Sequence, residues 1–326
     1  MKPSPAFVLR VCVLLLAATV GFGVVNNLPD IWHPLVENMT PVRSEEQPLR
    51  FVIVAPQAGH PYWEAVRKGA QEAGDQLHIN VEFTGARRAS IDEQVRLIDM
   101  ATAAQVDAII TQGVPDEQII EAVTRAMDRG IHVITVDVDL PDYRLDGRVA
   151  YVGTDNYAAG RLMALELVQR TAGKAVVGIV RGNLGPEAED LRVKGFRDAL
   201  EPYDEVKIVA VETSEMNRSV AGQKALKMMV EHPDLTVIYG TTALDAIGAL
   251  QSVTRYGSRV VVLGWDDVAE AADYVARGSL GAVVHEEPAL MGRRAVELLG
   301  EYLRRDVRPP DITPTPYYIR VGGDTR

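Results

Sequence analysis

From residue 51 onward, short runs of apolar and often β-branched residues alternate with longer segments in which apolar residues return at helical spacing. The first run covers residues 51–55, and Pro61 then opens a segment in which Val66 and Ala70 share one helical face. Short apolar runs bounded by turn residues predict buried strands, and the amphipathic segments between them predict helices.

The alternation continues almost to the end of the chain. Strands are predicted at 51–55, 81–84, 106–111, 131–137, 149–154, 175–180, 206–211, 235–239, 260–263 and 280–284. Helices are predicted at 61–77, 90–104, 115–129, 156–171, 186–200, 219–231, 243–255, 268–277 and 288–304. So many strand–helix units exceed one ordinary doubly wound domain, and the pattern predicts an α/β protein with two parallel-sheet domains.

Three carboxylates, Asp137, Asp155 and Asp266, come directly after apolar runs that are predicted strands. In open α/β sheets, ligands bind in the crevice beyond the carboxyl ends of the strands. Each of these residues could instead cap the helix that follows it. Because three of them occur in one chain, we favour a polar cleft that accepts hydrogen bonds from a small ligand.

Composition narrows the class of protein. The chain has 326 residues, of which 47% are hydrophobic, and a net charge of −11. An acidic chain is a poor partner for nucleic acid, because phosphate contacts need clustered Lys and Arg. The only cysteine, Cys12, excludes a disulfide framework. It opens an apolar run instead of following one, which is the wrong position for a lipoprotein cysteine.

The amino terminus has the pattern of a targeting segment. Lys2 and Arg10 precede an uncharged apolar run that ends at Val25, so residues 1–25 are predicted to be a signal peptide or a membrane anchor. The positive charges keep that end in the cytoplasm and place the remainder outside it. Residues 26–50 are polar and contain Pro, which predicts a linker.

The ordered motifs of the chain resemble those of a known family, the type I periplasmic sugar-binding proteins related to ribose-binding protein. The motifs are Gly59-His60-Pro61-Tyr62-Trp63, Val133-Ile134-Thr135-Val136-Asp137, Gly153-Thr154-Asp155-Asn156, Gly195-Phe196, Leu263-Gly264-Trp265-Asp266 and Glu286-Glu287-Pro288. The resemblance implies two Rossmann-like lobes that close over a ligand about three hinge strands.

By this resemblance the N-terminal lobe comprises residues 51–154 and 287–314, and the C-terminal lobe comprises 155–286 and 315–326. The implied hinge positions are Thr154, Asp155, Glu287 and Pro314.

The resemblance also implies a ligand site. Its positions are His60, Tyr62, Trp63, Asp137, Asp190, Met216, Thr242, Asp266 and Glu286. Tyr62 and Trp63 match aromatic residues that sandwich a sugar ring, although core packing is the alternative for Trp63. Asp137 and Asp266 match acids that accept hydroxyl hydrogens, and Glu286 matches a position that usually holds Gln.

Two positions depart from the ribose-type pattern, because Val138 and Asp190 stand where those relatives carry Arg. Without these two forked donors, we expect a site that repels acidic ligands. A neutral sugar, a polyol or a cationic amino sugar is the expected ligand, and no cofactor or metal is expected.

Two roles remain open for such a protein. It either delivers its ligand to an ABC-type permease, or stays tethered outside the cytoplasm and signals to a membrane receptor such as a sensor kinase. A DNA-binding repressor of the same core fold is rejected, because the amino terminus holds an export segment in place of a helix-turn-helix. No catalytic motif and no metal-ligand spacing of the six histidines occurs, so we do not expect an enzyme.

Overall fold

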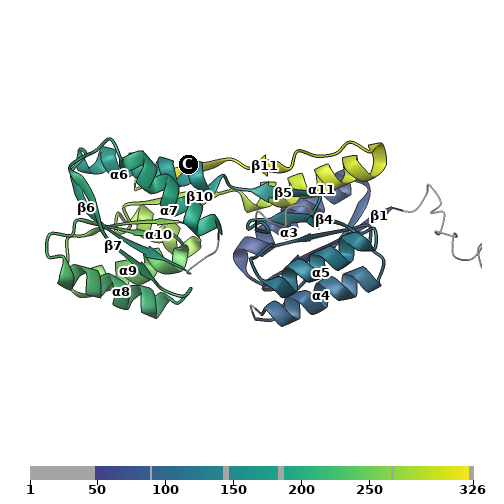
Figure 1. Cartoon of the computed structure of the whole chain (residues 1–326), viewed down its shortest axis with the longest axis horizontal. Helices are drawn as coiled ribbons and strands as arrows, with labels where there is room; N and C mark the ends of the chain where they lie inside the picture. The colour runs from purple at the N-terminus through teal and green to yellow at the C-terminus, as the bar shows by residue number, and fades with distance from the viewer. Residues whose placement is uncertain (1–47, 89, 142–146, 183–186, 266–267, 323–326) are drawn as a thin grey trace, which may run out of the picture. The chain divides into compact units, whose positions relative to one another are not determined.

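The computed structural model describes residues 48–88, 90–141, 147–182, 187–265 and 268–322. Within these residues the strands form two six-stranded sheets, and each sheet is covered by helices on both faces (Figure 1). Each sheet with its helices is one α/β lobe. The predicted amino-terminal segment and all but the last residues of the predicted linker lie outside the described part of the chain.

The first sheet is parallel throughout, in the order β11-β5-β4-β3-β1-β2. Its strands are β1 (Leu49–Ala55), β2 (Ile79–Gly85), β3 (Ala108–Thr111), β4 (His132–Val136), β5 (Ala150–Gly153) and β11 (Ile312–Pro314). One face packs against α3 (Pro61–Leu77) and α11 (Pro288–Arg305), and the other against α4 (Ile91–Ala103) and α5 (Glu117–Asp128). The central strands are buried on both faces, which explains their continuous apolar runs.

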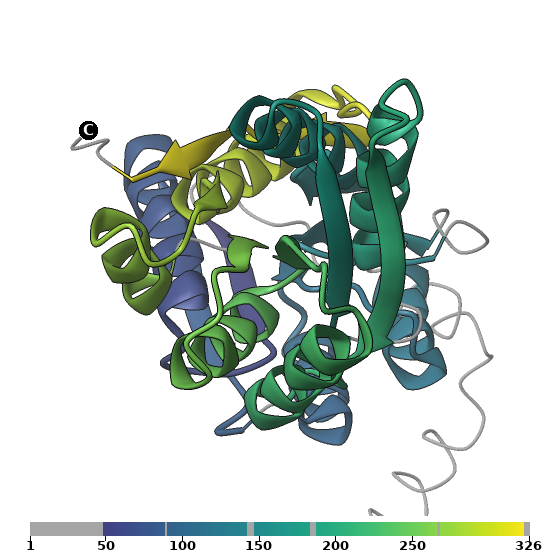
Figure 2. The ribbon, with the colours of Figure 1, turned by 90° about the vertical axis from the view of Figure 1, so that its left-hand side faces the viewer.

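The second sheet has the order β12-β10-β9-β8-β6-β7 and is parallel except for its edge strand β12. Its strands are β6 (Ala175–Arg181), β7 (Val206–Thr213), β8 (Val237–Gly240), β9 (Val261–Trp265), β10 (Ala282–Glu286) and β12 (Tyr317–Val321). Its helices are α6 (Asn156–Thr171), α7 (Glu187–Leu200), α8 (Arg218–Glu231), α9 (Ala243–Arg255) and α10 (Ala269–Ala276). Figure 2 looks onto this lobe and shows β6 and β7 side by side.

The chain passes between the two sheets three times. Thr154 and Asp155 lie between β5 of the first sheet and α6 of the second lobe, and Glu287 lies between β10 and α11. The last passage follows Pro314, which ends β11, and leads into β12. Three of the predicted hinge positions, Thr154, Asp155 and Glu287, lie on connecting segments, and Pro314 is the last residue of the strand before the third one.

Most predicted elements are present, with boundaries that differ by one to a few residues because helix and strand ends depend on tertiary contacts. The capping box is confirmed, since the Ser90 hydroxyl accepts from the Glu93 amide. The strands β11 and β12 are not in the sequence prediction. The strand β11 has three residues and ends in Pro314, and β12 contains Arg320 and is only partly buried, so neither has the apolar run that marks the central strands.

Candidate functional site

Polar side chains of the first lobe gather where β1, β3 and β4 end. Tyr62 lies in the first turn of α3 after β1, Gln112 follows β3, and Asp137 follows β4. Because these strands are parallel and adjacent, their carboxyl ends meet at one edge of the sheet. The order of the sheet, rather than the order of the sequence, brings the three side chains together.

Asp137 is the centre of this group. Its Oδ1 accepts from the Tyr62 hydroxyl at 3.0 Å, and its Oδ2 accepts from the Gln112 amide at 2.6 Å. The backbone of Asp137 has a φ of 72°, a left-handed conformation that non-glycine residues rarely adopt. The Tyr151 hydroxyl donates to its carbonyl at 2.8 Å and helps to hold this turn. Strained backbone of this kind is concentrated at functional sites.

The electrostatic setting of Asp137 is unusual for a carboxylate. Burial, and after it the nearby Glu286 carboxylate, raise its pKa from 3.8 to about 6 against the opposing charge of the Arg192 guanidinium. Glu286 ends β10 in the second lobe and is only 5% exposed. Its Oε2 has no hydrogen-bond partner among the described residues. A buried acceptor without a donor is costly, so a ligand hydroxyl is a fitting partner for it.

Arg192 lies on α7 in the second lobe. Its guanidinium stacks on the ring of Trp265 at 3.9 Å, donates from Nε to Asn156 Oδ1 at 2.8 Å, and donates from Nη1 to the Thr241 carbonyl at 2.8 Å. The Trp265 ring is fully buried, and its Nε1 has no partner among the described residues. Although Val138 and Asp190 stand where ribose-type relatives carry Arg, one guanidinium, that of Arg192, is still present. It is bound by protein groups and is close enough to lower the pKa of Asp137.

A close helix contact sets the position of Arg192. A Cβ built on Gly195 would lie 2.0 Å from the Tyr157 carbonyl oxygen, so only glycine lets α7 approach α6 this closely. This approach brings Arg192, one turn before Gly195, within hydrogen-bond distance of Asn156 at the start of α6.

The other predicted site residues of the second lobe have different settings. Asp190 is exposed and forms an ion pair with Arg181. Met216 is 50% exposed with a φ of 55°, and its amide donates to the Gly182 carbonyl. Thr242 is buried and caps α9 by accepting from the Asp245 amide at 3.2 Å.

Asp266, the remaining predicted residue of this lobe, lies outside the described residues.

In the first lobe, His60 is exposed at the N-cap position of α3 and makes no side-chain cap bond, while burial lowers the pKa of its imidazole. Trp63 is 4% exposed and lies in the core with Val66 and Met291. This is the core-packing alternative for Trp63. Its ring meets that of Tyr62 edge-on at 6.2 Å.

Asp155 is a helix cap, because its carboxylate accepts from the Ala158 amide at 2.9 Å.

Sequence reasoning missed Gln112 and Arg192. Gln112 follows an apolar run, as Asp137 does, so the rule used for the acids would have found it if applied to amides. No local signal marks Arg192, because its partner Trp265 comes from a different strand far along the chain. Asp139, which also follows β4, is committed to a fork from Arg148, with Nε to Oδ1 at 2.6 Å and Nη2 to Oδ2 at 2.5 Å.

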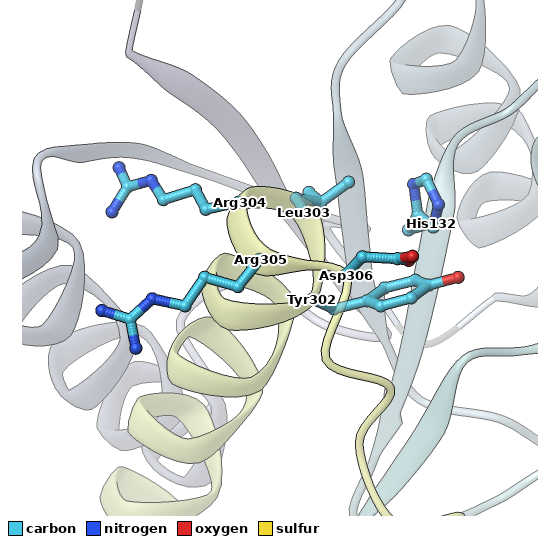
Figure 3. A pocket seen from close by; sticks show the side chains of 6 residues that line it. All are labelled: His132, Tyr302, Leu303, Arg304, Arg305 and Asp306. Carbon is cyan, nitrogen blue, oxygen red and sulfur yellow. The ribbon is translucent and has the colours of Figure 1, made fainter.

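A separate pocket of about 490 Å³ lies at the opposite edge of the first sheet. It is lined by His132 at the start of β4 and by the end of α11, where the Asp306 carboxylate points toward Tyr302 (Figure 3). His132 and Asp137 stand at opposite ends of the same strand, so this pocket is distinct from the polar cluster.

Among the described residues, no group of His, Cys, Asp and Glu is arranged to hold a metal ion. No helix in the same part of the chain has the length and hydropathy that crossing a bilayer requires.

Two parallel-sheet lobes linked by three chain passages, with polar groups from both lobes around Asp137, define the class of periplasmic binding proteins. The sequence model of the periplasmic binding protein domain matches residues 51–306. The chain belongs to the type I periplasmic sugar-binding protein family.

Similar proteins include the D-allose-binding periplasmic protein of Escherichia coli (strain K12), which is 24% identical over 257 residues, or 76% of this chain and 83% of that protein. Among solved structures, GanP, a glucose-galactose binding protein from Geobacillus stearothermophilus, is 38% identical with a TM-score of 0.80, covering 86% of this chain and 99% of that chain. XylFII in the XylFII–LytSN complex is 28% identical with a TM-score of 0.73, covering 86% of this chain and 100% of that chain.

Proposed function

We propose that the protein binds one small sugar or polyol outside the cytoplasm, in the cleft between its lobes, and delivers it to an ABC-type importer. The observation that carries this proposal is the carboxylate pair of Asp137 and Glu286, one from each lobe, in which Glu286 Oε2 lacks a donor among the described residues. Sugar hydroxyls are donors of the required kind, and bonds to a charged acceptor are strong. A ligand that bridges both lobes would favour their closure.

The charges of the site favour a neutral or cationic ligand over an anionic one. The Glu286 carboxylate already raises the pKa of Asp137, and the negative charge of an anionic ligand would add to this repulsion. The guanidinium of Arg192 does not offset this freely, because Asn156 and Thr241 hold two of its nitrogens. We therefore propose that the ligand is a neutral sugar, a polyol or an amino sugar, and that sugar acids and phosphosugars do not bind.

Known relatives support a sugar and suggest where to start. The 38% identity to GanP covers nearly all of that chain, and GanP is a glucose-galactose binding protein. The D-allose-binding relative is more distant. D-glucose, D-galactose and D-allose are therefore the first ligands to test.

The proposal assigns no catalysis. The similar proteins GanP and the D-allose-binding protein are binding proteins. The bound sugar should therefore be recovered chemically unchanged.

We further propose the lobe limits that the sequence predicts, with residues 51–154 and 287–314 in one lobe and 155–286 and 315–326 in the other.

A tethered sensor is the second candidate function. Its support is that XylFII, a relative of 28% identity, has been solved in complex with another protein, LytSN. In this alternative, residues 1–25 anchor the chain, and a membrane receptor such as a sensor kinase reads the closed lobes. The sugar-binding step is common to both candidates, and only the partner differs.

A thermal-shift screen tests the shared step. A ligand that binds only the folded state raises the melting temperature, by an amount that grows with its concentration relative to Kd. We expect at least one neutral sugar, polyol or amino sugar to raise it. A screen in which no such compound stabilises the protein, while a sugar acid or phosphosugar does, would contradict the proposed function.

A further inference from the structure

The second lobe contains a buried polar network that the proposed sugar site does not use directly. Asp245, Ser214 and Thr241 are fully buried, and Glu189 is 5% exposed. They come from α9, from the turn after β7, from the turn after β8 and from α7. All lie at the carboxyl edge of the second sheet, behind the loops that carry the predicted ligand residues of this lobe.

The network has two carboxylates with one hydroxyl between them. Glu189 Oε2 accepts from the Thr241 hydroxyl at 3.1 Å and from the Gly182 amide at 2.7 Å. Asp245 Oδ2 lies 3.5 Å from the same hydroxyl, and its Oδ1 accepts from the Ser214 hydroxyl at 2.5 Å. Thr241 therefore stands between Glu189 and Asp245.

Backbone carbonyls next to this network accept hydrogen bonds from residues at the proposed sugar site. The Thr241 carbonyl accepts from Arg192, whose charge acts on Asp137. The Gly182 carbonyl accepts from the Met216 amide at 2.7 Å. The loops after β6, β7 and β8 are thus joined to one another and to Arg192 through side chains that solvent does not reach.

Folding alone gives little reason for this arrangement. Two buried carboxylates near each other are costly, and burial, with a smaller contribution from the Glu189 charge, raises the pKa of Asp245 to about 6. Apolar side chains of similar volume are often at least as stable in such places. Fully bonded polar networks do, however, fix one geometry, which a binding site needs.

We propose that Thr241, held between Glu189 and Asp245, is a positioning residue for the sugar site, acting through Arg192 and the loops after β6 and β7 without touching the sugar. This inference rests on the proposed function, because it assigns the geometry of the same site. The hydroxyl group carries the effect, and the methyl group of Thr241 only fills space.

Two substitutions separate these groups. Thr241→Val keeps the shape and removes the hydroxyl, whereas Thr241→Ser keeps the hydroxyl and removes the methyl. For folded protein titrated with whichever of D-glucose, D-galactose and D-allose binds the parent, we expect Thr241→Val to weaken affinity about tenfold and Thr241→Ser by less than about threefold. The opposite order would show a packing role and overturn the proposal.

Leu250→Ala is the matched control for stability. Leu250 is buried on the same helix, α9, in an apolar cluster. Its truncation should lower the free energy of unfolding and leave sugar affinity within about twofold of the parent. A loss of affinity in Leu250→Ala as large as in Thr241→Val would show that affinity follows stability alone, and the proposal would fall.

Amide hydrogen exchange of the unliganded protein tests the network without any sugar. The Gly182 amide reports on Glu189 directly, so Thr241→Val should speed its exchange about tenfold or more relative to Leu250→Ala. Equal exchange in the two variants overturns the proposal. If the parent binds none of the three sugars, the choice of sugar in the proposed function is wrong, while the exchange result still decides the role of Thr241.

Discussion

At the scale of single residues, Asp137 combines the features of a ligand-binding carboxylate: a left-handed backbone, two ordered donors and a pKa raised to about 6. Tyr62 and Gln112 orient its two oxygens. The negative charge of Glu286, in the other lobe, raises the pKa of Asp137. The unpartnered Glu286 Oε2 suits a hydroxyl donor of a ligand, and the two carboxylates impose a cost on an anionic one.

Replacing Asp137 by Asn should weaken sugar binding by roughly 1–3 kcal/mol, since the amide nitrogen cannot accept a hydroxyl hydrogen. At about pH 4, where the Asp137 carboxyl is protonated in the folded protein, the free energy of unfolding should change little, because no packing volume is lost. Calorimetric titration and urea unfolding of the same preparation separate the two effects. The sequence assigns Asp266 a similar role, and parent-like binding by both Asp137→Asn and Asp266→Asn would refute the assignment.

The raised pKa of Asp137 predicts how stability changes with pH. Because its pKa is 3.8 ordinarily and about 6 in the folded protein, the carboxyl binds its proton more tightly when folded. Its contribution to the free energy of unfolding is therefore complete below about pH 4 and is lost as pH rises through about 6. Asp245 acts in the same direction.

Asp137→Asn should accordingly show a smaller decrease in unfolding free energy than the parent between about pH 4 and pH 7. Urea unfolding at several pH values measures both curves. Since Asp245 titrates in both proteins, the difference between the curves isolates Asp137. Parallel curves would mean that Asp137 has no raised pKa in the folded state.

The sequence predicted Asp137, Tyr62 and Glu286 for this site but missed Gln112 and Arg192, and the difference has a physical reason. Asp137, like Gln112, follows an apolar strand, and strand ends can be read locally. The stacking of Arg192 on Trp265 joins α7 to β9 and leaves no local pattern. Trp63 belongs to a motif that suggests ligand stacking, and its side chain lies in the core, so its ligand role stays a prediction.

At the scale of elements, the helices and central strands were predictable because their apolar periodicity and caps are local, as in Ser90 with Glu93. The edge strands β11 and β12 were not, because they take their structure from pairing with β5 and β10. The strand β11 is largely exposed and ends in Pro314, so it needs support beyond its pairing with β5. That support comes from Arg148.

Arg148 joins β11 to the rest of the first sheet. Its fully buried guanidinium forks onto Asp139 and donates from Nη1 to Asp311 Oδ1 at 2.8 Å, directly before β11. Arg148→Ala should therefore lower the free energy of unfolding by about 3–5 kcal/mol, because Asp139 loses its partner in a partly buried position. Urea unfolding measures this loss.

Lys174→Ala is the control, since the Lys174–Glu205 pair is exposed and should contribute at most about 1 kcal/mol. Equal small effects of the two substitutions would contradict a structural role for Arg148.

At the scale of the whole molecule, attachment to the membrane decides between transport and sensing. We predict that residues 1–25 are retained as an anchor, because about 25 further residues precede the first strand and a flexible chain of that length spans roughly 25–30 Å. Such a linker would let the lobes reach beyond the lipid headgroups. Cell fractionation followed by amino-terminal sequencing of the mature chain measures this. Soluble protein that begins just after Gly23 or Val25 would show a cleaved signal peptide and remove the anchor that the tethered sensor requires.

The central claim is that the cleft between the lobes binds one neutral or cationic sugar through Asp137. Isothermal titration calorimetry of the parent with D-glucose, D-galactose, D-allose, an amino sugar and a sugar acid tests it most directly. The account predicts 1:1 binding of at least one neutral or amino sugar, no binding of the sugar acid, and clear weakening in Asp137→Asn. Tight binding of the sugar acid, or binding that Asp137→Asn leaves unchanged, would contradict it.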